Sequence, residues 1–554
     1  MKSIFLINDR NKYIILFAAI ILVYIFGMFV DVMEVDAAQY ATISMEMSQT
    51  KSFLHVYEQG NDYLDKPPLL FWLSSLSFMI FGISNFAYKL PSVLIALLGI
   101  YSTYRFSLSW YSKQKSILSA LILASSQALF LITNDVRTDT MLLGLTMFSA
   151  WQLNDYIKSS RFRNLLLSSI GIGLAMMAKG PIAIVVIALA FGGNFLLKCE
   201  WRNIFKPQWL LLLFFVALTL VPMCYGLYTQ FDMHPEKHVY GLDGPSGIKF
   251  FFWTQSFGRI TGENYWSDGS GYLYFFHTIL WDFQPWVFLF VPALIIKIIR
   301  LFKQKFKVDS NSEYISLCGF VFVFLALSFS NYKLPHYIFV IFPFASIITA
   351  DFIYELKEKT SVKVAGAMYG AMILFWLLIA VGFVLVFSPR NLVLPILLIL
   401  AFFINLYLFV KIKNPAQKIF IPTTITIVCF NLMMALHFYP NLLQYQANSQ
   451  AGIYVRENKL PETNVYRYEA ASHSFDFYTR TLTKYITQND LANVKPKDWI
   501  YTDLKGLTSL ENNNVDYNLI ETFKSFRVTH LELDFLLKSS RDKTLTYNYL
   551  IEIK

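Results

Sequence analysis

The chain has 554 residues, of which 55% are hydrophobic, 17% aromatic and only 15% charged. Soluble globular chains carry about a quarter charged residues, so this composition excludes an ordinary soluble protein. The net charge of +10 does not indicate a nucleic-acid partner, because lysines and arginines gather in short loops between apolar runs, as in membrane proteins. The four cysteines lie in or beside apolar segments, and their spacing favours neither a disulfide framework nor a metal site.

Apolar runs of about 18 to 24 residues recur along the chain from residue 13 to residue 437, and this length is what a helix needs to cross a bilayer. Basic residues precede the first run and no small-residue cleavage site follows it, so we expect an uncleaved signal-anchor helix with a cytoplasmic N-terminus. Residues 31–85 then form the first external loop. Within it, residues 67–82 are too short to cross easily and open with two prolines, which predicts a helix lying at the membrane interface.

Assigning the strongly basic loops to the cytoplasmic side gives about thirteen crossings, and all of those loops then fall on one side. The predicted crossings are residues 13–30, 86–107, 117–133, 140–157, 165–178, 181–197, 208–228, 272–296, 314–330, 335–350, 364–387, 392–410 and 419–437. The pattern predicts a polytopic α-helical membrane protein in which residues 1–438 form the membrane domain.

Residues 439–554 have ordinary charge density and short mixed segments, which predicts one soluble α/β domain on the external side. Strands or buried edges are expected at "NVYRYEA", "DWIYTDL", "NNVDYNLIETF" and "VTHLELDFLL". Helices are expected at "NSQAGIYVRENK" and "ITQNDLANV".

This topology gathers polar residues at the outer rim of the membrane. They are Glu34, Asp36, Asp62, Asp65, Lys66, Asp135, Arg137, Asp139, Lys179, Arg259, Glu263, Lys333, His336 and Tyr337. Ionisable groups at membrane depth are costly unless they face protein or a water-filled cavity, so these residues are functional candidates. Cations from separate loops suit a phosphate or diphosphate, whereas an aspartate beside that anion suits a general base. The combination predicts group transfer from a phosphate-linked donor that is borne by a lipid.

Each of these residues also has a purely structural interpretation, and the functional one gains weight only from their shared side. The structural alternatives are a helix cap for Asp36, interfacial snorkelling for Lys66, a helix end at Lys179, a surface ion-pair cluster of Asp135, Arg137 and Asp139, and aromatic-belt positions for His336 and Tyr337.

Several motifs in the same order resemble a known superfamily. They are "VDAAQYATISMEM", "YLDKPPLLFWL", "YKLPSVL", "VRTDTMLLGL", "MMAKGPIA", "FFWTQSFGRITG", "NYKLPHYIFVIFPFAS" and, in the tail, "SHSFDFYTR". Together they resemble the polyprenyl-phosphate-sugar-dependent glycosyltransferases of the GT-C superfamily. The likeness is greatest to the group of lipid A aminoarabinose transferases, which are kin to the protein O-mannosyltransferases. The resemblance spans nearly the whole chain, and it implies a fold with thirteen membrane helices.

The resemblance also implies roles for individual residues. Asp36 matches the essential acidic position of the first external loop, and Asp139 matches a second acidic position; we expect both to be catalytic. The residues expected to hold the donor phosphate are Lys66, Arg259 and Tyr337, which match the superfamily, with Lys179 and Lys333 added from their place at the rim. Further candidates for the site are Glu34, Asp65 and His336.

This sequence departs from the superfamily pattern at two positions. Ala37 follows the first aspartate where a glutamate is common, so the base would act without that neighbour. Ser256 stands where relatives often carry a histidine. If that histidine binds a metal together with the acid before the lysine, which is Asp65 here, this chain has lost one ligand. We therefore do not predict a metal, although dependence on a divalent metal stays open, and no other cofactor is predicted.

The resulting hypothesis is an integral membrane glycosyltransferase in the inner membrane of a bacterium. It would move a sugar, with inversion, from a polyprenyl-phosphate (undecaprenyl-phosphate) donor to a lipid-linked or envelope glycan acceptor such as a lipid A-like molecule. Membrane lipids are the other expected partners, and nucleic acid is not one. An alternative within the enzyme class is protein O-mannosyl transfer. An alternative of another class is a transporter or flippase of lipid-linked sugars, which the lack of an internal repeat and the charges at one rim disfavour.

Overall fold

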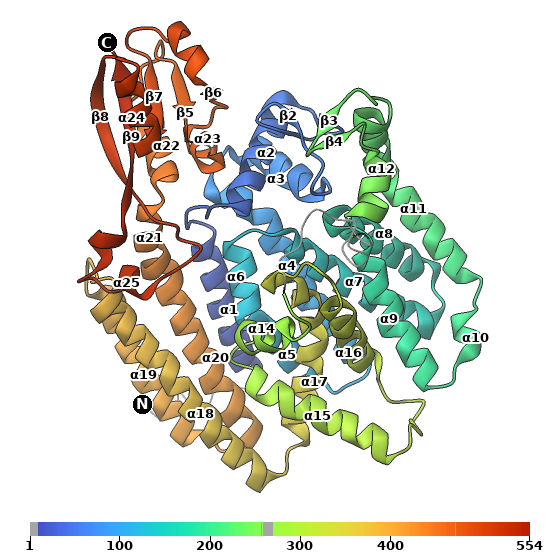
Figure 1. Cartoon of the computed structure of the whole chain (residues 1–554). Coiled ribbons are helices and arrows are strands. Elements are labelled where there is room, and N and C mark those ends of the chain that lie inside the picture. Colours follow the sequence, from blue (N-terminus) through green and yellow to red (C-terminus); the bar gives the residue numbers. More distant parts are fainter. Residues whose placement is uncertain (1–8, 256–257, 259–269, 471) are drawn as a thin grey trace.

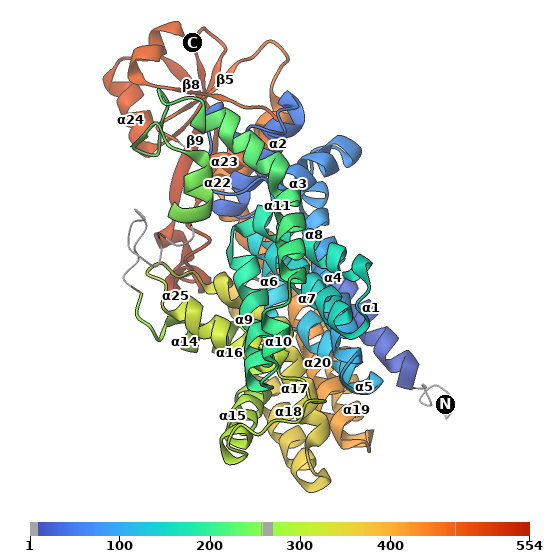
Figure 2. The ribbon, with the colours of Figure 1, turned by 90° about the vertical axis from the view of Figure 1, so that its right-hand side faces the viewer.

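The computed structural model describes residues 9–255, 258, 270–470 and 472–554. A large assembly of helices takes up most of the chain, and an α/β unit formed by the C-terminal residues stands at one end of it (Figure 1). Helix α1 (Asp9–Gly27) begins toward the opposite end from that unit, as the view turned by a quarter also shows (Figure 2).

The helices of this assembly are joined by short connections and two longer loops. The α-helices are α1 (Asp9–Gly27), α2 (Asp36–Thr50), α3 (Leu69–Phe81), α4 (Asn85–Leu108), α5 (Lys113–Ala124), α6 (Gln127–Asn134), α7 (Thr138–Ser159), α8 (Phe162–Lys179), α9 (Ile182–Leu197), α10 (Trp201–Ile204), α11 (Gln208–Leu227), α12 (Gly247–Lys249), α14 (Tyr274–Asp282), α15 (Val287–Lys303), α16 (Ile315–Ser328), α17 (Phe342–Glu355), α18 (Glu358–Val381), α19 (Val393–Lys411), α20 (Pro415–Met433) and α21 (Tyr439–Leu442).

Short π-helical or 3-10 segments accompany several of them, namely η1 (Tyr228–Asp232), η2 (Phe250–Thr254), η3 (Pro335–Ile341), η4 (Gly382–Val386), η5 (Met434–Phe438) and η6 (Leu443–Tyr445). The longer loops each contain a small antiparallel hairpin. The hairpins are β1 (Tyr57–Glu58) with β2 (Asn61–Asp62), and β3 (His238–Val239) with β4 (Leu242–Asp243).

Among the described residues, six helical segments are long and apolar enough to cross a bilayer, and a seventh crossing arises if α5 and α6 together form one span. Shorter apolar helices, α3 among them, accompany these segments. The chain is thus a helical protein with several candidate membrane spans, as its hydropathy predicts. The count of about thirteen crossings is not confirmed by these helix lengths and stays a prediction.

Two predicted crossings are broken helices in the structure. Residues 117–133 form α5 and α6, which are bent by 48° at a break occupied by Ser125 and Ser126. Both serine hydroxyls donate to carbonyls of the preceding turn, a pattern that bends helices. Residues 272–296 divide into α14 and α15, and the break contains Pro285, which lacks the N–H donor of a continuous helix.

The two breaks face each other and satisfy each other's polar groups. The Gln127 N–H donates to the Gln284 carbonyl at 3.0 Å, and Trp286 Nε1 donates to Ser125 Oγ at 3.0 Å. Buried backbone polar groups need such partners, especially at membrane depth. The broken helices are therefore a built part of the fold.

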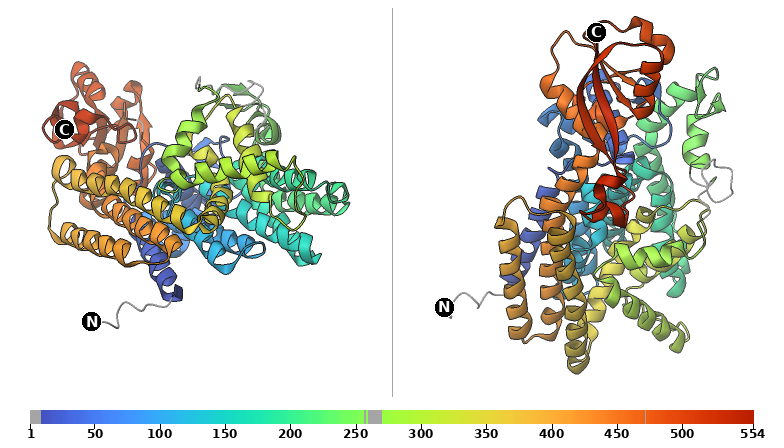
Figure 3. Two further views of the ribbon diagram at one scale, coloured as in Figure 1. Left: turned by 90° about the horizontal axis from the view of Figure 1, so that it is seen from below. Right: turned by 60° about the vertical axis from the view of Figure 1, so that its left-hand side comes forward.

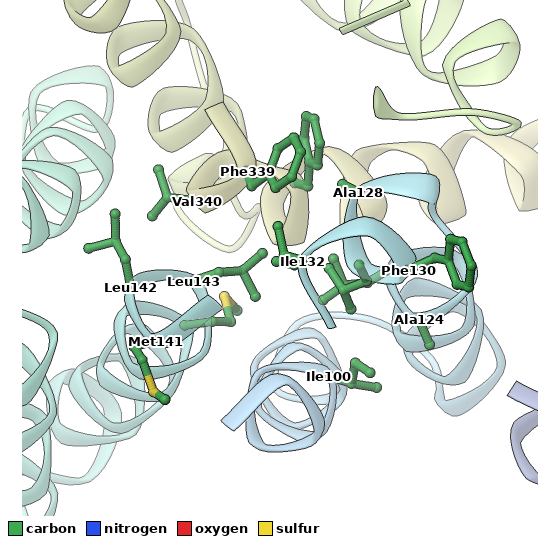
Figure 4. Packing of buried hydrophobic residues seen from close by; sticks show 14 of the residues in the cluster. Ile100, Ala124, Ala128, Phe130, Ile132, Met141, Leu142, Leu143, Phe339 and Val340 are labelled. Atoms are coloured by element: carbon green, nitrogen blue, oxygen red, sulfur yellow. The ribbon is translucent and has the colours of Figure 1, made fainter. Parts of the chain in front are cut away.

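The core around these helices is apolar and closely packed. Buried side chains from α4, α5, α6, α7 and η3 meet in it, and Figure 4 shows Ile100, Phe130, Ile132, Leu143 and Phe339 among them. Helices α4 and α7 approach closely, because Gly99 and Gly144 face each other; a Cβ on Gly99 would lie 2.9 Å from the Gly144 Cα. This close contact fixes the position of α7, whose first turn carries Asp139.

The C-terminal unit, defined here as residues 446–554, is built on one five-stranded mixed sheet (Figure 3). Its strands are β5 (Val465–Tyr468), β6 (Lys484–Ile486), β7 (Trp499–Asp503), β8 (Tyr517–Ser525) and β9 (Thr546–Ile553), in the spatial order β6-β5-β7-β9-β8. β5 is parallel to β6 and β7, whereas β9 is antiparallel to β7 and β8. The accompanying helices are α22 (Ala447–Asn458), α23 (His473–Thr479), η7 (Gln488–Asn493), α24 (Leu504–Asn512), α25 (Leu533–Leu536) and η8 (Arg541–Thr544).

Three of the predicted strands and the first predicted helix of this unit are confirmed, as β5, β7, β8 and α22. The prediction of a strand or buried edge at "VTHLELDFLL" is wrong, because this segment forms a turn followed by α25. Apolar and polar residues alternate there, but only Phe535 is deeply buried within α25. It stacks on Phe526, with ring centroids 3.7 Å apart. The packing of Phe535 holds this segment in place without pairing to a neighbouring strand.

Candidate functional site

A pocket of about 190 Å³ lies between α2, the loop before α3, the N-terminus of α7, the ends of α8 and α16, and η3. One part of its wall is polar and the other is apolar. The polar lining residues are Asp36, Tyr40, Lys66, Arg137, Thr138, Asp139, Lys179, Gln255, Ser330, His336 and Tyr337. The apolar ones are Pro67, Leu142, Pro181, Ile182, Val185, Ala326, Leu327 and Leu334. Such a pocket suits a ligand with a charged head and a hydrocarbon tail.

The first charged group of the pocket is the ion pair of Asp36 and Arg137. Arg137 Nη1 donates to Asp36 Oδ2, while its Nε and Nη2 donate to Asp135 Oδ2 at 2.9 and 2.8 Å. Arg137 is largely buried, with 15% of its side chain exposed, whereas 41% of the Asp36 side chain remains exposed. The guanidinium thus holds Asp36 in place, and the carboxylate stays open to the pocket.

Asp36 does not cap α2. The helix begins at Asp36 itself, its N-cap residue is Val35, and no side-chain capping hydrogen bond is present. An acid in the first turn is still favoured by the helix dipole. The structural alternative of a helix cap is therefore wrong for this residue, and the pocket-facing ion pair takes its place.

A second charged group joins Asp139, Lys179 and Tyr337. Lys179 Nζ donates to Asp139 Oδ1 and lies 3.9 Å from the centre of the Tyr337 ring. The Asp139 side chain is almost fully buried, with 3% exposed, and His336 Nε2 lies 3.7 Å from its other oxygen. A cation held by a carboxylate and an aromatic face has a well-defined position.

The chain ends α8 directly after this lysine. Gly180 follows with φ of 88°, a conformation that favours glycine, and Pro181 then precedes α9. The turn aims Lys179 into the pocket from the end of its helix. The structural interpretation of Lys179 as a helix end is correct, and it coexists with a place in the pocket wall.

A third charged group stands at the start of α3. Lys66 Nζ contacts Asp65 Oδ2 at 2.8 Å, and Gln255 Nε2 donates to Asp65 Oδ1 at 2.6 Å. Lys66 and Gln255 line the pocket, and Asp65 joins them from behind. An ammonium group has three N–H donors, so a single carboxylate contact leaves Lys66 able to bind an anion.

The structure brings most of the predicted site residues together. Those that line the pocket are Asp36, Lys66, Asp139, Lys179, His336 and Tyr337. Three candidates lie outside the pocket wall. Asp65 contacts Lys66 and Gln255 of the wall, Lys333 is buried and its Nζ donates to the Ser270 carbonyl at 3.0 Å, and Glu34 is bonded to residues of the C-terminal unit. The last candidate, Arg259, lies outside the described residues.

Sequence reasoning missed Arg137, Tyr40 and Gln255 as pocket residues. Arg137 was expected at the outer rim, with a surface ion-pair cluster as its structural alternative, but it was given no role in the site, because it stands between two aspartates in a short external turn. The structure divides that cluster: Asp135 binds Arg137, whereas Asp139 turns inward to Lys179. No three His, Cys, Asp or Glu side chains gather as a metal site in the part of the chain that the structure describes.

Comparisons with known proteins show what this chain is similar to. The family model described as dolichyl-phosphate-mannose-protein mannosyltransferase matches residues 65–225, a segment that includes Lys66, Arg137, Asp139 and Lys179. The undecaprenyl phosphate-alpha-4-amino-4-deoxy-L-arabinose arabinosyl transferase of Wigglesworthia glossinidia brevipalpis is 25% identical over 365 residues, which cover 64% of this chain and 61% of that protein. The corresponding transferase 2 of Proteus mirabilis (strain HI4320) is 24% identical over 59% of this chain and 56% of that protein. The chain thus matches less than two thirds of the length of these curated relatives.

Two solved structures share the fold over almost the whole chain. Crystal structures of ArnT from Cupriavidus metallidurans superpose with TM-scores of 0.74 in the form bound to undecaprenyl phosphate and 0.73 in the apo form. The superpositions cover 93% and 98% of this chain and 97% and 98% of that protein, at 15% identity. The chain has the ArnT fold, and its resemblance to the GT-C glycosyltransferases, inferred above from motifs, is confirmed.

Proposed function

We propose that this protein is an integral membrane glycosyltransferase of the GT-C type that takes its sugar from a polyprenyl-phosphate donor. The observation that carries the proposal is the pocket itself, in which three ion-paired cations and an exposed carboxylate share a wall with apolar helix surface. A lipid phosphate needs both surfaces at once, because its phosphate requires cationic donors and its chain requires an apolar path. The curated relatives with aminoarabinosyl transferase names support the same class of donor.

Lys66 and Lys179 hold the donor phosphate in this proposal, and Arg259 is the further cation that sequence resemblance adds. Lys66 lies in the loop before α3 and Lys179 at the end of α8, and both line one pocket. Tyr337 lies against Lys179 and helps to fix its position, and His336 lies beside Tyr337 and 3.7 Å from Asp139, the ion-pair partner of Lys179. The apolar residues of α9 and α16 that line the same pocket receive the first isoprene units.

Asp36 is the general base in this proposal, and Asp139 positions Lys179. The two aspartates differ in exposure, at 41% and 3% of their side chains, so only Asp36 presents its carboxylate to an incoming hydroxyl. Of the residues that the structure describes, only Arg137 donates a hydrogen bond to Asp36, through Oδ2, which leaves Oδ1 available to accept a proton. A base must lie within hydrogen-bond reach of the proton it takes, so in this proposal the acceptor hydroxyl approaches Oδ1 from the open side of the pocket.

The reaction then follows in one displacement. The acceptor hydroxyl gives its proton to Asp36 while its oxygen bonds to the anomeric carbon of the sugar. The bond between that carbon and the phosphate oxygen breaks, and the electron pair leaves with the phosphate, whose charge Lys66 and Lys179 stabilise. With one base and no glycosyl-enzyme intermediate, the anomeric configuration inverts.

The acceptor in this proposal is a lipid-linked or envelope glycan such as a lipid A-like molecule, on the outer side of a bacterial inner membrane. A protein hydroxyl is the second candidate, because the matching family model is described by protein mannosylation. Comparing lipids and envelope glycans by mass spectrometry in cells with and without the gene separates the two. A glycolipid that loses a single sugar supports the first acceptor, a glycoprotein that does so supports the second, and no change in either class contradicts transfer.

The topology of about thirteen crossings, with residues 1–438 in the membrane domain and residues 439–554 outside the cell membrane, belongs to the same proposal. It is supported by the distribution of basic loops. Cysteines introduced at Ser160 and Ser539, both exposed, test it in a background that lacks the exposed Cys199. An impermeant thiol reagent added outside should label position 539 alone. Labelling of both positions, or of position 160 alone, contradicts the topology.

A further inference from the structure

The two acids that precede and begin α2 face different parts of the molecule. Asp36 lines the pocket and binds Arg137 of the helix bundle. Glu34, only two residues earlier, is absent from the pocket wall and reaches into the C-terminal unit. The segment between them therefore connects the pocket with a unit whose sequence begins about four hundred residues later.

The Glu34 carboxylate is the centre of a polar cluster. Its Oε1 accepts from Asn448 Nδ2 at 2.8 Å and from Ser472 Oγ at 3.1 Å, and Ser474 Oγ donates to the same atom. Hydrogen bonds to a charged acceptor are the stronger kind. All three donors belong to the C-terminal unit.

The backbone of the same segment is clamped as well. The Glu34 N–H donates to Gln446 Oε1 at 2.9 Å, and Gln446 Nε2 donates to the Val32 carbonyl at 3.0 Å. The Val32 N–H donates to the Tyr478 hydroxyl at 2.7 Å. A single glutamine side chain therefore bridges two backbone groups on the segment that leads into Asp36.

The cluster is anchored in the sheet of the C-terminal unit. Asn448 Oδ1 accepts from the Tyr501 hydroxyl of β7 at 2.6 Å and from Asn548 Nδ2 of β9 at 3.3 Å. Tyr501 is fully buried and stacks on Phe475, with ring centroids 4.5 Å apart. Glu34 is thus bonded to side chains that the rigid sheet fixes.

We propose that Glu34 is a positioning residue, through which the C-terminal unit holds the Asp36 carboxylate in its reactive place. The proposal rests on the proposed function, since it gives Asp36 the role of base. A displacement of about 1 Å in a reacting group is enough to lower a rate about a hundredfold. Asp36 is tethered on one side by Arg137 and on the other by the two-residue connection to Glu34, so loss of the second tether frees the carboxylate to shift.

Other contacts of the C-terminal unit, with α2 and with the turn between β1 and β2, do not involve Glu34. The Thr42 hydroxyl donates to the His473 carbonyl at 2.7 Å, and Gln59 Nε2 donates to Asp476 Oδ2 at 2.6 Å. These contacts keep the unit docked when Glu34 is altered. A Glu34 variant should therefore fold, with its effect confined to the segment before α2.

The test compares Glu34→Ala, Glu34→Gln and Asn448→Ala in the full-length protein in detergent. The matched control is Glu457→Ala on α22, an exposed glutamate that forms an ion pair with its neighbour Arg456. Glu34→Ala and Asn448→Ala should lower kcat at least about tenfold, with KM for the polyprenyl-phosphate sugar changed less than about twofold. Glu34→Gln keeps an acceptor oxygen for Asn448 and the serines and should restore most of the rate.

Hydrogen exchange of the backbone amides supplies a measurement that does not need transfer activity. In Glu34→Ala the peptide covering residues 28–40 should exchange at least about tenfold faster, while the sheet strands β7 and β9 keep their wild-type rates. Unchanged exchange and an unchanged kcat in Glu34→Ala overturn the proposal. So does a Glu34→Gln variant as slow as Glu34→Ala, because the charge rather than the tether would then be needed.

The same measurements separate this proposal from the proposed function. If the wild-type protein binds undecaprenyl phosphate but transfers no sugar, the proposed function fails, and the exchange measurement still decides whether Glu34 tethers the segment. If the wild type is active and the Glu34 variants only melt at lower temperature with normal kcat, the residue is structural and the positioning role is wrong.

Discussion

Variants of the ion pair of Lys179 and Asp139 should separate an effect on stability from an effect on activity. Asp139 has only 3% of its side chain exposed and Lys179 only 15%, and Lys179 Nζ donates to Asp139 Oδ1. Removing one partner leaves the other charge buried without its counter-ion, which costs about 3–5 kcal/mol. Replacing both by apolar side chains of similar size removes the charge problem and is often close to neutral. Lys179→Met and Asp139→Leu should each destabilise the protein strongly, and the double variant should recover much of the loss.

Activity should not recover with stability. The double variant has no cation at this position to bind the donor phosphate, so both undecaprenyl-phosphate binding and sugar transfer should stay low. The measurements are thermal melts in detergent, lipid-phosphate binding and transfer, for the two single variants and the double variant. Lys115 and Asp351, paired at 2.6 Å between α5 and α17 and not part of this pocket, form the matched control. Asp351 also lies 3.8 Å from Lys297, so the Lys115→Met and Asp351→Leu variants should melt closer to the wild type, and all of them should keep normal transfer.

Two results would refute this reasoning. A Lys179→Met protein that melts like the wild type shows that the buried carboxylate does not need its lysine. A double variant that folds and transfers sugar at the wild-type rate removes Lys179 from the phosphate site.

Two other predictions use the same chain. Lys66→Ala should weaken undecaprenyl-phosphate binding roughly ten- to a hundredfold, because a hydrogen bond to a charged group is worth about 1.5–3 kcal/mol; a titration that finds unchanged affinity removes Lys66 from the site. Burial, together with the nearby Arg467 guanidinium, lowers the pKa of the His473 imidazole below 6.5 in the folded protein. The folded state then binds fewer protons than the unfolded state, so the free energy of unfolding should fall as the pH drops below about 6.5, and His473→Gln should flatten that part of the melting profile. A variant with the wild-type slope contradicts the assignment to His473.

The sequence predicted the general architecture because hydropathy and basic loops are local signals. It did not predict the breaks at Ser125 and at Pro285, since the few polar residues and the proline there interrupt runs that are otherwise apolar over the length of a crossing. Each break is stabilised by the other, through the hydrogen bond from the Gln127 N–H to the Gln284 carbonyl. The sequence of one segment alone does not predict such a contact. The hydropathy pattern therefore predicted one continuous crossing for α5 with α6 and another for α14 with α15.

The site was predictable to the extent that its residues share one rim of the membrane. Asp36, Lys66 and Lys179 were expected to meet for that reason, and they line one pocket. Glu34 was expected at the same site, because it is only two residues from Asp36 in the sequence. Its partners are Asn448 and Ser472, about four hundred residues away, and only the folded chain shows that the side chain turns toward them.

The central claim is that Asp36 is the base that accepts the proton of the acceptor. Asp36→Asn keeps the size of the side chain and an oxygen that can accept from Arg137, and it removes the negative charge. The measurement is the rate of sugar transfer from a purified polyprenyl-phosphate sugar pool, with lipid-phosphate binding and a thermal melt as controls for folding. Turnover should fall at least about a hundredfold, the usual lower range for loss of a general base, while binding persists. A well-folded Asp36→Asn protein with a nearly wild-type rate would contradict the account.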